Sequence, residues 1–90
     1  MGDNCLIINI SKEINSSLEL NSYATEFIEN LDNFDDDEFI IDFRGVYFIS
    51  RTFAQAYYAS KKRSLKIIVE INLSDDVKPL MDMVEKQIIG

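Results

Sequence analysis

The chain has 90 residues, of which 47% are apolar and 28% are charged. A chain of this length supports one domain with one core, and this composition is typical of a folded protein rather than a disordered one. The formal net charge is −7. An acidic protein is repelled by phosphate backbones, so we expect no nucleic-acid binding. We interpret residues 1–90 as a single domain.

The cysteine content and the length of the apolar runs indicate the cellular location. Cys5 is the single cysteine and there is no histidine, so no intramolecular disulfide can form, although small secreted domains normally carry several. The apolar run at residues 5–10 is far shorter than the roughly 20 residues of a membrane span, and no basic secretion signal precedes it. We therefore expect a cytoplasmic protein without a membrane segment.

No pattern of catalytic residues is present. The sequence lacks a Cys/His pair, a Gly-rich phosphate loop and a Ser–His–Asp set, and most acid–base mechanisms near pH 7 use histidine. The acidic run at residues 35–38 lacks the spaced ligands and central glycine of a calcium loop, so we interpret it as a solvated loop. We expect no enzyme activity, no cofactor and no metal site.

The first half of the chain predicts two strands and a helix. Residues 5–10 form a β-branched run typical of a strand, and residues 18–20 are predicted to pair back on it as a short second strand. The residues between them are polar and turn-like. A helix follows, capped by Asn21 or Ser22. Its apolar residues lie at helical spacing on one face: Tyr23, Ala24, Phe27, Ile28 and Leu31.

The second half predicts two strands that alternate with two helices. Residues 39–43 are continuously apolar up to an acid, which is typical of a central strand covered on both faces. Thr52 and Gln55 fit a capping box that opens a helix ending at Lys61, Lys62 and Arg63, whose charges complement the dipole there. Residues 65–71 predict a strand. The last helix is predicted to begin near Asp75 or Asp76, with Pro79 in its first turn.

The predicted order is β-β-α-β-α-β-α. Strands that alternate with amphipathic helices imply right-handed crossovers and a mostly parallel sheet. The predicted class is therefore an α/β domain.

Residues 39–58, FIIDFRGVYFISRTFAQAYY, resemble the signature of the STAS domain, the fold of bacterial anti-sigma factor antagonists. The resemblance is strongest to the STAS-like family of unknown function, and it extends over residues 18–71. The matching parts of this sequence are Asp42–Phe43, Gly45–Val46, Phe48–Ile49 and Ser50–Ala54. The resemblance implies a STAS-like, four-stranded, mixed and mostly parallel sheet with three helices, and a role in protein–protein switching.

The resemblance also implies a partner class. Anti-sigma factor antagonists bind a kinase of the histidine-kinase-like ATPase fold, which phosphorylates a serine in an Asp-Ser-Ser/Thr-Gly-Leu-Gly motif. Here the motif's aspartate falls on Ser50, the phosphorylated serine on Arg51 and the next hydroxyl on Thr52. Because Arg51 cannot accept a phosphate and both glycines are replaced, the kinase switch does not carry over unchanged. The fold and the use of this surface are what the resemblance predicts.

The candidate binding residues cluster in one stretch. We predict a partner-binding surface formed by Arg44, Tyr47, Ser50, Arg51, Thr52 and Gln55. Thr52 is interpreted first as a helix N-cap, with phosphorylation as the alternative, because a helix start favours a dianion. An exposed arginine there could grip a carboxylate.

We make further predictions for three side chains of the same stretch, Asp42, Tyr57 and Tyr58. Asp42 is expected to be partly buried, which would raise its pKa, and to hydrogen-bond to the next loop. Of Tyr57 and Tyr58, one is expected in the core and one on the surface.

The sequence thus predicts a non-catalytic STAS-like regulatory or adaptor module that binds a protein partner. A histidine-kinase-like ATPase is the partner class implied by the resemblance. The alternative is a small-molecule or nucleotide sensor that binds an anion at the helix start near Thr52. The oligomeric state is left open.

Overall fold

Three parallel strands form the central sheet of the computed structural model, which describes residues 5–90. They are β1 (Cys5–Asn9), β3 (Glu38–Asp42) and β5 (Ile67–Ile71), in the order β1-β3-β5. The predicted central strand is confirmed, since β3 pairs with both neighbours. Residues 1–4, in which we expect no secretion signal, lie outside the described range.

A second, two-stranded parallel sheet replaces the predicted pairing of residues 18–20 with the first strand. β2 (Ser17–Leu18) pairs with β4 (Phe48–Ile49), so the predicted single sheet of four strands is wrong. The α/β class with parallel strands is confirmed. The cause is a helix directly after β1, because it turns the chain away from the main sheet.

Four α-helices are present within residues 5–90 instead of three. The additional helix, α1 (Ile10–Glu13), replaces a predicted turn, and Asn9 caps it by accepting a hydrogen bond from the Lys12 N–H. The others are α2 (Asn21–Asn30), α3 (Arg51–Arg63) and α4 (Lys78–Ile88), with a short 3-10 turn, η1 (Leu31–Asn33). None of the helices in residues 5–90 has the length and apolarity needed to cross a membrane.

Two helix starts differ from their predictions. The residue before α2 is Leu20, which makes no side-chain cap, so neither Asn21 nor Ser22 acts as one. α4 begins at Lys78, after a turn at residues 75–77, and Pro79 lies in its first turn as predicted.

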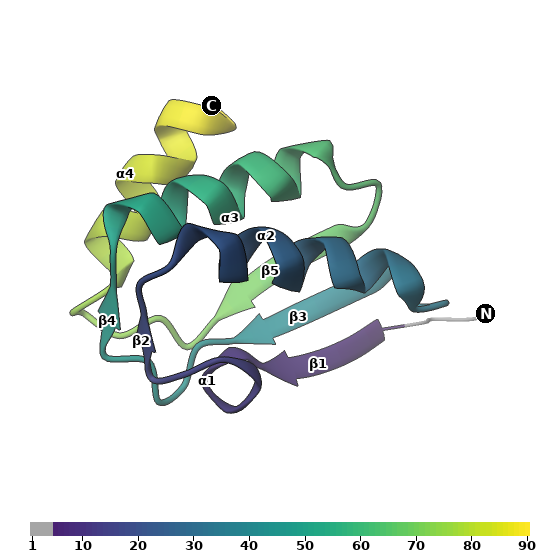
Figure 1. Cartoon of the computed structure of the whole chain (residues 1–90), viewed down its shortest axis with the longest axis horizontal. Coiled ribbons are helices and arrows are strands. Elements are labelled where there is room, and N and C mark those ends of the chain that lie inside the picture. The colour runs from purple at the N-terminus through teal and green to yellow at the C-terminus, as the bar shows by residue number, and fades with distance from the viewer. Residues whose placement is uncertain (1–4) are drawn as a thin grey trace.

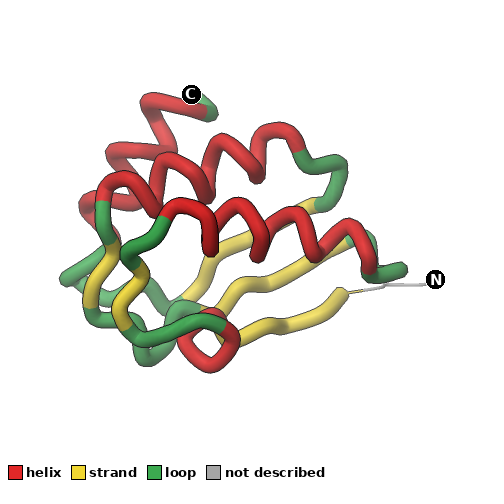
Figure 2. Tube along the Cα trace, in the orientation of Figure 1, coloured by secondary structure: helices red, strands yellow, loops and turns green. Residues whose placement is uncertain are grey.

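The long helices α2, α3 and α4 all lie on one face of the sheet (Figures 1 and 2). α3 packs against α2 on one side and α4 on the other. This central position buries both Tyr57 and Tyr58, so the prediction that one of them is exposed is wrong. Because α2, α4 and the sheet cover α3 on three sides, two adjacent aromatic side chains of this helix can both be buried.

No helix formed by residues 5–90 covers the opposite face of the sheet (Figure 1). In register across this face lie Ile7, Ile40 and Val69, and Ile7 is 63% exposed. The prediction that the central strand is covered on both faces is therefore wrong. The sheet has a buried face under the helices and an open apolar face.

One charged network lies beneath α3. Glu70 of β5 points to the helix side, where the Tyr57 hydroxyl donates to its carboxylate at 2.9 Å and Lys61 Nζ lies 2.9 Å from the same oxygen. Burial raises the pKa of Tyr57 well above its ordinary value, and the charge on Glu70 adds to this effect. The phenol therefore stays protonated, and Lys61 is held by an internal partner.

Candidate partner-binding site

Ser50 is the N-cap residue of α3 and directly precedes Arg51, the first residue of the helix. Its Oγ accepts a hydrogen bond from the Phe53 N–H at 3.0 Å and donates to the Glu19 carbonyl at 2.7 Å. Thr52 is the second residue of the helix, so its predicted role as N-cap, with Gln55 completing the capping box, is wrong. The N-cap of α3 is therefore two residues earlier than the sequence predicted. The Ser50 hydroxyl also links the end of β4 to the segment after β2.

This geometry predicts unequal effects of two small substitutions. Ser50→Ala should lower the free energy of unfolding by about 1–2 kcal/mol, because it removes the cap and the bond to Glu19. Thr52→Val keeps the shape of the side chain at an exposed site and should cost less than about 0.5 kcal/mol. Urea unfolding of both variants measures the difference. An equal cost for the two would contradict the assignment of the cap to Ser50.

The predicted site residues lie along β4 and the first turn of α3. Arg44, Tyr47, Arg51, Thr52 and Gln55 are exposed, whereas Ser50 is partly buried. Thr52 and Gln55 are three positions apart in the helix, and Arg51 and Gln55 are four apart, so these side chains share one side. Arg44 precedes β4 and Arg51 follows it. The extended segment therefore separates the two arginines, which do not form one cluster.

Phe48 is an exposed residue of the candidate site that the sequence did not reveal. It is 47% exposed, next to Tyr47 at 64%, while Ile49 is buried. Residues 46–49 formed one apolar stretch in the sequence, and the exposure of Phe48 depends on which face of the short β4 packs inward. We define the α3-start surface as the exposed residues of this region: Tyr47, Phe48, Arg51, Thr52 and Gln55.

The turn between β3 and β4 is held rigidly. Asp42 accepts hydrogen bonds from the Asn72 amide at 3.0 Å and from the Arg44 backbone N–H at 2.9 Å. These bonds lower the pKa of Asp42, so the predicted rise is wrong and the predicted bond to the next loop is confirmed. Gly45 has φ +92°, and a Cβ there would lie 2.9 Å from Ser11 Oγ. The turn thus requires glycine.

Most of the lysines and arginines between residues 43 and 69 have internal partners. Lys66 Nζ donates to the carbonyls of Phe34 and Asp36, and Lys62 Nζ donates to the carbonyl of Ile88. Arg51, in contrast, forms no ion pair or side-chain hydrogen bond with residues 5–90. Its guanidinium is therefore available to a partner.

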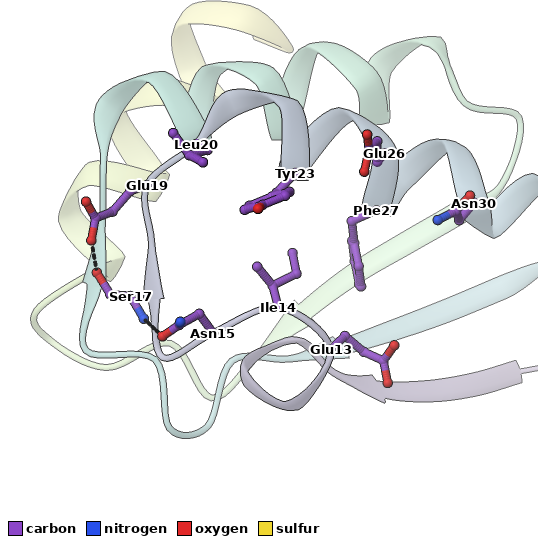
Figure 3. A pocket seen from close by; sticks show the side chains of 10 residues that line it. All are labelled: Glu13, Ile14, Asn15, Ser17, Glu19, Leu20, Tyr23, Glu26, Phe27 and Asn30. Atoms are coloured by element: carbon purple, nitrogen blue, oxygen red, sulfur yellow. Dashed lines mark hydrogen bonds between the residues drawn. The ribbon is translucent and has the colours of Figure 1, made fainter.

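A groove lies between α2 and the segment from α1 to β2 (Figure 3). Its volume is about 670 Å³, within the range of natural binding pockets. Apolar and acidic side chains from both walls line it: Glu13, Ile14, Glu19, Leu20, Tyr23, Glu26 and Phe27. Tyr23 and Phe27 lie on the helix face that the sequence marks as apolar, but helical spacing does not show what covers such a face. We call this feature the α2 groove.

No metal centre can be built from the described side chains. Within residues 5–90, no three Cys, Asp or Glu side chains gather in a way that could hold an ion.

Comparisons with known proteins complete the picture of the site. No model of a protein family, no curated protein and no solved structure matches this chain. Its function is therefore inferred from its own residues and their arrangement.

Proposed function

We propose that this chain is a non-catalytic adaptor that docks on a protein partner through the α3-start surface. The exposure of Tyr47 and Phe48 beside Arg51 supports this function. Tyrosine and arginine are enriched among the residues that dominate binding energy at protein interfaces. Two exposed aromatic residues at neighbouring positions of the sequence provide a large area to bury, and the removal of such rings from water by a partner is favourable.

Charge indicates the chemistry of the partner. The protein carries a net charge of −7, but this surface combines the unpaired guanidinium of Arg51 with the N-terminus of α3, which has a positive partial charge. A partner that presents a carboxylate next to an apolar pocket would complement both features. We therefore infer an acidic patch bordering a hydrophobic one on the partner.

The resemblance of residues 39–58 to STAS-like proteins suggests a partner class, an ATPase of the histidine-kinase-like fold. Thr52 is exposed beside Arg51. A phosphate on its hydroxyl would replace the local positive field with a dianion. Phosphorylation of Thr52 would accordingly weaken docking of an acidic partner, which would make this surface a switch.

Amide hydrogen exchange in the complex tests this proposal. The partner is first recovered by native co-purification and identified by mass spectrometry, and the complex is then reconstituted from pure proteins. The backbone N–H groups of Arg51 and Thr52 lie in the first turn of α3, where helices leave such groups free. We expect their exchange to slow on binding, together with that of residues 46–49. Slowing confined to α4 or to residues 31–37 would overturn the assignment of this surface.

A further inference from the structure

The α2 groove offers an apolar floor to solvent. Ile14 of one wall and Phe27 of the other are partly buried, whereas Leu20 is 56% exposed and Tyr23 is 49% exposed. Figure 3 shows the Ile14, Tyr23 and Phe27 side chains directed into the space between α2 and the segment below it. Binding of a ligand with an apolar body would bury these side chains, and this burial would stabilise the complex.

The rim of the groove is acidic. Glu13, Glu19 and Glu26 line it, and no lysine or arginine does. Glu13 and Glu26 form no ion pair with any of residues 5–90, and the Glu19 carboxylate accepts a hydrogen bond from the Ser17 hydroxyl, at 2.6 Å, but forms no ion pair with these residues. The rim therefore attracts positive charge. Because none of the described residues that line the groove is cationic, a bound ligand would have to supply that charge.

The positions of these carboxylates set the pattern of a ligand. Glu19 lies at one end of the groove, and Glu13 and Glu26 lie toward the other, with the apolar side chains between (Figure 3). From Leu20 to Asn30 the α2 wall extends about 15 Å at the rise of a helix. An extended peptide covers that distance in about five residues.

We propose that the α2 groove binds a short extended segment of another protein in which cationic residues flank an apolar centre. The apolar centre packs on Tyr23 and Leu20, and the cations reach the carboxylates at the two ends. An arginine is favoured at these ends, because it can also stack on an exposed aromatic ring. A small polyamine matches the charges but has no apolar side chains to cover the floor.

Titration of the full-length ¹⁵N-labelled chain with capped pentapeptides tests the proposal. The probes are Arg-Leu-Val-Leu-Arg, its acidic counterpart Glu-Leu-Val-Leu-Glu, and spermidine. We expect the basic peptide to bind with chemical-shift changes centred on residues 13–30, and the other two probes to bind at least about tenfold more weakly. No binding of the basic peptide at millimolar concentration, or equal binding of spermidine, would overturn the proposal.

Two charge reversals on the same helix separate the groove from general acidity. Glu26→Lys should weaken the binding of the basic peptide about tenfold. Glu29→Lys makes the same change at an exposed position that does not line the groove, and it should have little effect. Equal weakening by both variants would show that only the overall charge of the protein attracts the peptide. Arg51→Glu should leave this titration unchanged, so failure here and failure of the α3-start surface are distinguishable.

Discussion

Replacing Ile41 with aspartate should abolish cooperative folding of the domain at 25 °C. Ile41 lies in the middle of β3, beneath the helices, and its side chain is 0% exposed. An unpaired carboxylate there loses its hydration without gaining a partner, which costs several kcal/mol, and the burial of an isoleucine, about 1.5–3 kcal/mol, is lost as well. Together these costs approach a total stability of about 5–15 kcal/mol.

The open face of the same sheet provides a matched control. Ile7 lies in a strand like Ile41, but it is 63% exposed on the face without helices. Ile7→Asp introduces the same charge into water and should keep a cooperative thermal transition near that of the parent. Thermal denaturation followed by circular dichroism measures both variants. A parent-like transition in Ile41→Asp would contradict the burial of β3 under the helices.

The elements with strong local patterns were predictable from the sequence. α3 ends at Arg63 as expected, β5 falls within residues 65–71, and Pro79 lies in the first turn of α4. In each case the signal is short-range, since helical spacing, terminal cations and β-branched runs depend on residues a few positions apart. The α/β class follows from their alternation.

The errors have non-local causes. Leu18 pairs with Ile49 rather than with β1, and a partner 31 residues away leaves no mark on local periodicity. Tyr58 is buried because α4 covers the flank of α3, which no pattern within α3 reveals. The cap of α3 is Ser50 rather than Thr52 because Ser50 also bonds to Glu19.

The candidate site was only partly predictable. The exposure of Arg51 and Tyr47 agrees with the surface expected from the sequence. Phe48 and the α2 groove were not found, because both depend on which faces of β4 and α2 remain uncovered after packing. The sequence gives the positions of Glu13, Glu19 and Glu26, but only the fold shows that these side chains gather around one groove.

Arg51→Glu should sharply weaken binding of the protein partner. The substitution removes a donor that holds a partner carboxylate and replaces it with a repelling charge, so we expect a loss of about 1–3 kcal/mol, which raises Kd by about fivefold to more than a hundredfold. The fold should not suffer, since Arg51 is exposed and opens α3, where a glutamate interacts favourably with the helix dipole. Weaker binding with unchanged or slightly higher stability is the expected combination.

Lys86 provides the control for this change. It is exposed in the last turn of α4, so Lys86→Glu alters the net charge equally but lies outside the α3-start surface. A glutamate near a helix C-terminus opposes the dipole, so this variant should be slightly less stable and yet bind normally. The two variants therefore have opposite expected effects on stability, and only Arg51→Glu is expected to weaken binding.

Isothermal titration of the purified partner into the wild-type chain, Arg51→Glu and Lys86→Glu tests the adaptor proposal most directly. The proposal predicts that Kd rises by about fivefold to more than a hundredfold for Arg51→Glu and changes by less than about twofold for Lys86→Glu. An equal rise for both variants, or no rise for Arg51→Glu, would contradict the α3-start surface as the docking site.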